Sequence, residues 1–390
     1  MPELVAVTGI GVCTAFGAGV DAVRRGVFGG TAAFAPVTRF DAAPYRNRFA
    51  AVLPDDHAVW ASGSPAQLDL LRACTTEALD GARTRAKGAP FLLGTLGDRS
   101  GVLDFWRAEE DHAGYDDARL GVSSPAALAA VAAQEFGFGS ATAFSNACTA
   151  STTALAYGAQ LIRSGDVDLV VCGGSYVVSE DIFAKFDAGG AFSGHGVVRP
   201  FCRQRDGMLH GDGAAVLVLE SVPSARRRGA QTLALLRGWG LSADAHHPIQ
   251  PDPAGHGMAL AMRAAMRVAG CSPDDIGYVN AHGTGTPVND KAETAALYDV
   301  FGARAGTVPV SSTKGATGHM LEATGAVEAV ITVLALGDQR IPPTAGFLDP
   351  DPDCALDCVP NRGRAASPTY ALSLNAAFGG ANAALLFGTE

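Results

Sequence analysis

The chain has 390 residues, of which 48% are hydrophobic and 17% are charged, and its formal net charge is −10. A chain of this length and composition can bury a large core, which suits either two domains or one large duplicated α/β unit. The negative charge argues against sequence-independent binding of nucleic acid, so we expect no nucleic-acid partner.

Targeting segments and metal-binding patterns are missing from the sequence. The N-terminal residues lack the basic and apolar pattern of a signal peptide, and the longest apolar run, 326–337, is too short to span a membrane and contains Glu328. The eight cysteines form no CxxC pair, and Cys354 and Cys358 have no second ligand pair at zinc spacing. We therefore expect reduced, buried cysteines in a cytoplasmic protein that binds neither metal nor membrane.

Strand-like apolar runs alternate with helical patterns along the chain, which predicts an α/β fold with buried strands. The polar and basic segment 222–230 divides the chain, so we predict one half over residues 1–225 and a second over 226–390. A duplicated α/β unit fits this pattern, although the residues alone do not show it. The strand candidates are residues 4–11, 91–97, 168–174, 214–221, 276–282, 308–314 and 370–377, and the helical runs are 149–164, 254–269, 289–302 and 320–336.

Cys148 lies between a strand-like run, 141–147, and a helical pattern in which Leu155, Ala159 and Ile162 share one face. This spacing predicts that the thiol sits at a helix N-terminus, where the unpaired N–H groups and the helix dipole lower a thiol pKa. Cys148 is therefore a candidate nucleophile. The alternative is a small residue that a tight turn requires.

A second apolar strand ends at His282, and a loop with two hydroxyls, Thr284 and Thr286, follows it. These hydroxyls are suited to binding a polar ligand. Asp290, with Glu293 three residues later, has the pattern of a capping box that opens a helix. The alternative for His282 is a structural histidine at the end of a strand.

A third apolar strand ends in a glycine-rich loop that carries Lys314 and His319 and leads into a long helix. The alternative for Lys314 is a solvated lysine in a surface loop. Taken together, three kinds of reactive residue stand at the C-terminal ends of strands, where open α/β sheets bind their ligands. One cysteine with two histidines is a suitable set for covalent acyl chemistry.

Four motifs in order, "NACTAS", "NAHGTGTPVNDKAE", "SSTKGATGH" and "AAFGGANAALLF", resemble those of the elongating β-ketoacyl-acyl-carrier-protein synthases of the thiolase superfamily. The resemblance runs nearly from end to end. It implies a duplicated, layered αβαβα fold and a homodimer, with a heterodimer as the alternative. It also implies acyl groups delivered on phosphopantetheine thioesters by an acyl carrier protein, with no metal or redox cofactor.

The resemblance assigns a role to each candidate residue. It implies an acyltransferase that forms an acyl-cysteine and condenses it with a malonyl-type thioester, in polyketide or specialised fatty-acid biosynthesis. Two alternatives remain: an enzyme that cyclises or transfers a carrier-bound chain without elongation, and a non-catalytic partner subunit. By resemblance, the nucleophile is Cys148, the histidine pair is His282 and His319, the orienting lysine is Lys314, the pantetheine-binding residues are Thr284 and Thr286, the gate is Phe378, and the oxyanion hole is made by the N–H groups of Cys148 and Phe378.

The sequence departs from the family pattern at two places that bear on its substrate. Ala376 and Ala377 stand where the gating loop commonly has an aromatic residue and a glycine. The segments 61–71 and 191–201, which resemble carrier-docking regions, carry little positive charge, so they would steer an acidic carrier protein poorly. These departures favour a specialised ketosynthase of secondary metabolism with an altered docking surface.

Overall fold

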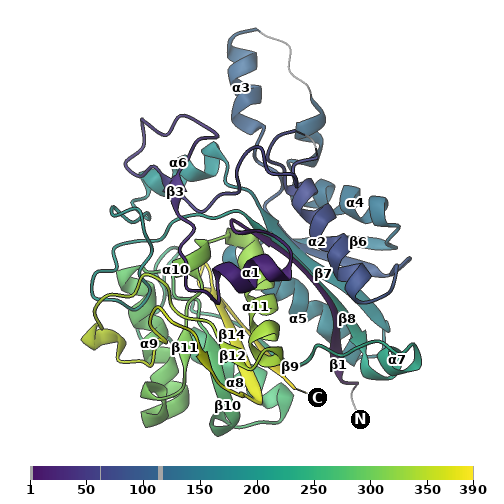
Figure 1. The fold of residues 1–390 in the computed structure, drawn as a ribbon, viewed down its shortest axis with the longest axis vertical. Helices are drawn as coiled ribbons and strands as arrows, with labels where there is room; N and C mark the ends of the chain where they lie inside the picture. Colours follow the sequence, from purple (N-terminus) through teal and green to yellow (C-terminus); the bar gives the residue numbers. More distant parts are fainter. Residues whose placement is uncertain (1–2, 62, 113–116, 390) are drawn as a thin grey trace.

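The computed structural model describes residues 3–61, 63–112 and 117–389. Its main sheet follows the order β11-β10-β14-β15-β9-β1-β8-β7-β5-β6 (Figure 1). The strands of the N-terminal half are β1 (Val5–Thr14), β5 (Pro90–Gly94), β6 (Ser140–Phe144), β7 (Leu169–Tyr176) and β8 (Gly213–Ser221). Those of the C-terminal half are β9 (Ala234–Ala243), β10 (Ile276–Asn280), β11 (Val310–Ser311), β14 (Tyr370–Ala376) and β15 (Ala381–Gly388).

The two halves share one topology. When the strands of each half are numbered along the chain, both halves have the spatial order 3-2-4-5-1. The directions agree as well, because β5 is parallel to β6 and β7 just as β10 is parallel to β11 and β14, while the remaining neighbours within each half are antiparallel. The duplication is therefore plain in the fold, and β1 joins β9 to link the halves.

Two helices, α5 (Ala150–Arg163) and α11 (Thr324–Gly337), pack against each other in the middle of the molecule. The predicted apolar face of α5, with Leu155, Ala159 and Ile162, is fully buried. Helix α11 is buried along almost its whole length, which explains why its sequence is apolar on all sides. The first turn of each helix thus starts deep inside the protein.

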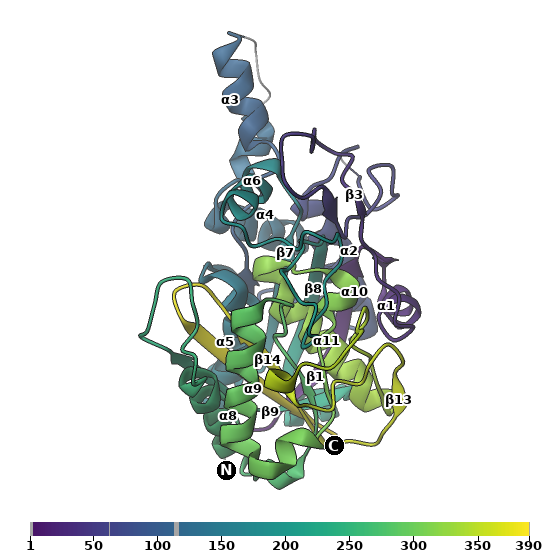
Figure 2. The ribbon, with the colours of Figure 1, turned by 90° about the vertical axis from the view of Figure 1, so that its left-hand side faces the viewer.

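Outer helices complete a layered αβαβα arrangement, which confirms the predicted fold class. Helices α2 (Gln67–Gly81) and α4 (Pro125–Phe136) cover the outer face of the N-terminal strands. Helices α8 (His256–Ala269) and α9 (Pro287–Phe301) cover that of the C-terminal strands. Alternate residues of β8 show the layering, since Val216 and Val218 face α2 while Leu217 and Leu219 join the central core. Figure 2 shows α3 projecting away from these layers.

The remaining elements are mostly short, and no helix of the described residues is long and apolar enough to cross a membrane. The helices are α1 (Val20–Gly26), α2 (Gln67–Gly81), α3 (Val102–Glu110), α4 (Pro125–Phe136), α6 (Glu180–Ala188), α7 (Val222–Arg227), α8 (His256–Ala269), α9 (Pro287–Phe301) and α10 (Lys314–Thr317). The short strands are β2 (Gly17–Ala18), β3 (Ala35–Pro36), β4 (Phe49–Ala50), β12 (Arg340–Ile341) and β13 (Arg364–Ala365).

Several predicted element bounds are wrong at the ends that form the site. Strand β11 has only two residues, where 308–314 was predicted, because the chain turns into α10 at Lys314. Helix α11 starts at Thr324, after a separate 3₁₀ turn, η5 (Leu321–Ala323). The predicted division after residue 225 falls inside α7, and the division into halves at that residue stays a prediction.

Candidate active site

Cys148 lies in a 3₁₀ turn, η2 (Ala147–Thr149), between β6 and α5. Ala147 has a φ of 54°, in the left-handed region that a residue with a Cβ rarely adopts. The turn places Cys148 directly before α5, as predicted, and the thiol lines a cavity of about 430 Å³. Only 7% of Cys148 is exposed.

The prediction of a lowered thiol pKa is wrong for this structure. The pKa of Cys148 is raised to about 12, first by burial and then by the nearby carboxyl of Glu322, while the charge of Lys314 acts in the opposite direction. The helix N-terminus is a local effect that the sequence shows, whereas desolvation arises from the tertiary fold. Cys148 therefore rests as a thiol and needs a base before it can act as a nucleophile.

His282 follows β10 and is held by a carboxylate from the next helix. The His282 backbone N–H donates to Oε1 of Glu293, and the Gly283 backbone N–H donates to Oε2, each at 2.7 Å. Gly283 has a φ of 38° and its Cβ position is filled by Ser312, so no other residue fits there. The loop is therefore fixed through its backbone, which leaves the imidazole facing the cavity.

The predicted capping box at Asp290 is wrong. Helix α9 begins at Pro287, and Thr286 is its N-cap residue. Asp290 lies inside the first turn and accepts hydrogen bonds from the backbone N–H groups of Phe201 and Gly285. The acidic residues of α9 thus bind the loops around the site instead of capping their own helix.

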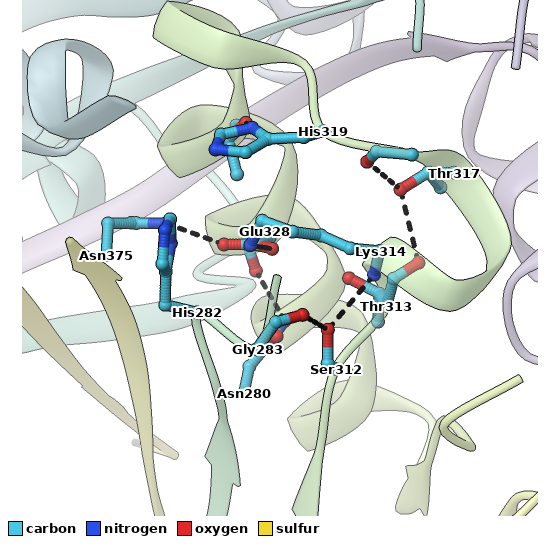
Figure 3. A network of polar contacts seen from close by, with 12 residues as sticks. Asn280, His282, Gly283, Ser312, Thr313, Lys314, Thr317, His319, Glu328 and Asn375 are labelled. Carbon is cyan, nitrogen blue, oxygen red and sulfur yellow. Dashed lines mark hydrogen bonds and ion pairs between the residues drawn. The ribbon is translucent and has the colours of Figure 1, made fainter. Parts of the chain in front are cut away.

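Lys314 is completely buried, so the alternative of a solvated loop lysine is wrong. Its Nζ donates to Oε1 of Glu328 at 2.5 Å, and Oε2 of Glu328 accepts a hydrogen bond from Asn375 at 2.7 Å. Asn375 in turn accepts from the Thr152 hydroxyl at 2.6 Å. Figure 3 shows Glu328 with Lys314 and Asn375, below His319 and beside His282.

The surroundings of His319 fix which of its ring nitrogens carries the proton. The Leu321 backbone N–H donates to Nδ1 at 3.1 Å, and the Thr324 hydroxyl lies 3.0 Å from the same atom. Because Nδ1 accepts, a neutral His319 must carry its proton on Nε2. By contrast, Nδ1 of His282 is buried without a hydrogen-bond partner among the described residues, so its tautomer is free to change.

Both imidazoles are neutral at physiological pH. Burial holds the pKa values of His282 and His319 well below their usual range, and the charge of Lys314 lowers both further. The ring centroids lie 5.4 Å apart with an interplanar angle of 81°. Lys314 therefore acts on the histidines through its charge, because its Nζ bonds to Glu328.

The cavity brings most of the predicted site residues together. Cys148 and both histidines line it, and the hydroxyls of Thr284 and Thr286 lie 2.8 Å apart on its wall. Lys314 does not line the cavity, and Figure 3 shows it below His319. Within the described residues, no three His, Cys, Asp or Glu side chains are grouped to hold a metal ion.

Phe378 lies at the mouth of the cavity, in the turn between β14 and β15, and is 45% exposed. Its ring stacks on Phe186 of α6, with centroids 5.8 Å apart and an interplanar angle of 21°. Gly379 and Gly380 have φ values of 87° and 77°, which a residue with a Cβ adopts at a cost. The Gly379 N–H donates to the Pro248 carbonyl and so ties the turn to the loop at the mouth.

Sequence reasoning missed the residues that support the candidate site. Glu328, Asn375 and Glu293 bind the loops and the lysine, and Phe186 packs on the gate. The sequence does indicate a partner for Glu328, because it is a lone carboxylate in an otherwise apolar helix and such a group needs a buried cation. Glu293 stood out only as part of a predicted capping box, and Asn375 and Phe186 show no such signal in the sequence.

Two family models match the chain. "Beta-ketoacyl synthase, N-terminal domain" matches residues 3–225, and "Beta-ketoacyl synthase, C-terminal domain" matches residues 233–348. The chain is 38% identical over 404 residues to the tetracenomycin polyketide synthase ketoacyl synthase alpha subunit of Streptomyces glaucescens, covering 96% of this chain and 95% of that protein. It is 42% identical over 246 residues to 3-oxoacyl-[acyl-carrier-protein] synthase 2 of Staphylococcus aureus, covering 62% of this chain and 61% of that protein.

Solved structures agree with these matches. The ishigamide ketosynthase/chain length factor superposes with a TM-score of 0.93 at 33% identity, covering all of both chains. A β-ketoacyl synthase from Burkholderia phymatum gives 0.89 at 29% identity, again over all of both chains. A type II polyketide ketosynthase, solved with its acyl-carrier protein and bound to the hexaketide, gives 0.89 at 25% identity over the same full lengths.

Proposed function

The chain belongs to the β-ketoacyl synthase family, and from this membership we propose that it condenses an acyl group on Cys148 with a malonyl-type thioester. One observation carries the proposal: a thiol and two neutral imidazoles from three separate strand ends line one cavity. The family consists of acyltransferases, and the named relatives support a role in polyketide or fatty-acid biosynthesis.

The first step loads Cys148. His319 cannot accept a proton at Nε2 because that atom already carries one, so we assign His282 as the base. His282 takes the thiol proton, the thiolate attacks the carbonyl carbon of the incoming thioester, and the carrier thiol leaves with the proton. The product is an acyl-cysteine, and the N–H groups of Cys148 and Phe378 bind the oxyanion in this proposal.

The second step forms the carbon–carbon bond. A malonyl-type thioester binds with its carbonyl oxygen near Nε2 of both histidines, and loss of carbon dioxide places negative charge on that oxygen. Each aligned donor lowers such a barrier by about 3–4 kcal/mol. The enolate carbon then attacks the acyl-cysteine carbonyl and releases the Cys148 sulfur. These steps use no metal or redox group, and in this proposal Thr284 and Thr286, which line the cavity, bond the pantetheine arm.

Two partners belong to the proposal. An acyl carrier protein delivers both thioesters, and the similar type II polyketide ketosynthase that was solved in complex with its own acyl-carrier protein supports this assignment. A second ketosynthase-like subunit pairs at the free edge of β6, whose residues Ser140, Ala141 and Thr142 are exposed. We expect a homodimer, with a heterodimer as the alternative.

The proposed location of the protein is the cytoplasm. All eight cysteines are free, which supports a reducing, cytoplasmic location.

Mass spectrometry combined with carbon dioxide release tests the proposed function. The protein is incubated with a panel of acyl thioesters, and the peptide that contains Cys148 is weighed before and after a malonyl-carrier thioester is added. We expect acylation of Cys148, then carbon dioxide release and a β-ketoacyl product, with Cys148→Ala as the control that gives no acyl-peptide. Acylation without carbon dioxide release would favour cyclisation or acyl transfer, and no acylation by any thioester would favour a non-catalytic subunit.

A further inference from the structure

A second buried polar cluster lies close to Cys148 and takes no part in the steps above. It consists of Tyr176, His210 and Glu322, whose exposed fractions are 1%, 0% and 4%, and we name it the rear cluster. The first two come from the N-terminal half and the third from the C-terminal half. Polar side chains this deeply buried need bonding partners, so their contacts show what the cluster can bind.

Glu322 lies in a turn that contacts both the turn of Cys148 and the strand of Tyr176. It is in η5, which packs against η2, where Cys148 lies, and against β7, which ends at Tyr176. The charge of its carboxyl raises the pKa of both the Cys148 thiol and the Tyr176 hydroxyl. Glu322 is therefore within electrostatic reach of the sulfur that carries the acyl group.

His210 lies directly behind the cavity wall. It is two residues from Met208 in an extended segment, so the two side chains lie on the same side, and Met208 lines the cavity. Its ring packs against Phe186, another cavity residue, with centroids 4.6 Å apart. The Tyr176 hydroxyl lies 3.1 Å from Nδ1, and a bond donated by that hydroxyl leaves the proton of His210 on Nε2.

Two atoms of the rear cluster have no partner. Nε2 of His210 and Oε2 of Glu322 are buried without a hydrogen bond among the described residues. The neighbouring Lys314–Glu328 pair differs, because both oxygens of Glu328 accept a hydrogen bond. With the Tyr176 hydroxyl donating to Nδ1, Nε2 of His210 is a donor, and Oε2 of Glu322 is an acceptor; a hydroxyl group has the chemistry to accept from the first and donate to the second.

We propose that the rear cluster is a subsite for the acyl group on Cys148 and selects chains with a hydroxyl group near the thioester over saturated chains. The hydroxyl oxygen accepts a hydrogen bond from Nε2 of His210, and its proton is donated to Oε2 of Glu322. A site that bonds a substrate hydroxyl discriminates strongly against the analogue without it, because its own buried groups are then left unpaired. This inference rests on the proposed acylation of Cys148.

The test compares acylation rates of Cys148 by intact mass with matched thioesters of N-acetylcysteamine. The acyl groups are hexanoyl, 3-hydroxyhexanoyl and 5-hydroxyhexanoyl. We expect at least one hydroxy chain to react about tenfold faster than hexanoyl. In Glu322→Leu and in His210→Leu this ratio should fall to about one, whereas Thr75→Val should keep it, because Thr75 has an equally buried, unpartnered hydroxyl on the outer helix α2.

A second measurement needs no variant and so does not depend on folding. The methyl ether of the preferred hydroxy chain cannot donate to Glu322, and we expect it to lose most of the advantage over hexanoyl in the wild-type protein. Equal rates for all chains, or a preference that survives both leucine substitutions, would overturn the rear cluster as a subsite. If no thioester acylates Cys148, the proposed function itself fails, which is a separate result.

Discussion

In the N-terminal half the loop after β6 carries Cys148, and in the C-terminal half the equivalent loop after β11 carries Lys314 and His319. The loops after β5 and β10 are also equivalent, yet the first is closed by hydrogen bonds among Gln67, Thr95 and Asp98, while the second presents His282. The same topology therefore occurs in both halves, and each half carries different functional residues. The N-terminal copy supplies the nucleophile, and the C-terminal copy supplies the groups that move protons and stabilise charge.

Removing the nucleophile of the N-terminal half should cause the largest loss of activity. Cys148→Ala is expected to lower acylation and condensation by at least about 10⁴-fold, because no other group in the cavity can form the thioester. Rates of acyl-peptide and β-ketoacyl formation check this. A variant that condenses substrates at the wild-type rate would show that the N-terminal half supplies no nucleophile.

The cysteines of the two halves should also differ in their response to pH. Cys148 has a pKa raised to about 12, so its thiolate fraction rises roughly tenfold with each pH unit from 7 to 10. Alkylation by iodoacetamide, followed by peptide mass, should therefore increase about 10³-fold over this range without a plateau. A plateau near pH 9 would mean that the cavity does not suppress the thiolate. Cys271 of the C-terminal half is less buried and serves as the internal comparison.

The buried ion pair of the C-terminal half has no counterpart at Cys148, and breaking it should destabilise the fold. Lys314→Met leaves Glu328 buried without its cation, which is expected to cost about 3–5 kcal/mol in the free energy of unfolding. Denaturant titration measures this. The double variant Lys314→Met/Glu328→Leu should recover a large part of the loss, since it leaves no unpaired charge. Equal stabilities for the single and double variants would contradict the pairing.

Removing one donor from the C-terminal half should separate the two steps of the reaction. His319→Ala is expected to lower condensation by about 10²–10³-fold, because one hydrogen bond to the developing enolate is lost. Acylation should fall far less, since His282 is the assigned base. Single-turnover measurements of both steps check this. Equal losses in both steps would mean that His319 also activates the thiol.

The sequence predicted the functional residues of each half where they stand out in a local sequence pattern. Cys148, His282 and His319 stand out because each lies at the end of an apolar run or in the loop that follows one, and their helices and strands follow from periodicity. The repeat of the topology was not visible, because it is a repeat of strand order and not of residues. The pKa of Cys148 depends on groups distant in the sequence, and Glu293 accepts hydrogen bonds from loop residues 11 and 10 positions before it, which a helix-capping pattern does not show.

The sequence also showed no indication of a role for Phe186. Its coupling to Phe378 is the smallest of the expected effects. The link from β7 to β8 is long and includes α6, which carries Phe186. The link from β14 to β15 is a tight turn, which carries Phe378. The two rings stack across the cavity mouth. A double-mutant cycle with Phe186→Leu and Phe378→Leu should give a coupling of about 0.5–1.5 kcal/mol in the free energy of unfolding. If the two halves also act together as a gate, the coupling should reappear in the acylation rate. No coupling in either measurement would show that the gate belongs to the C-terminal turn alone.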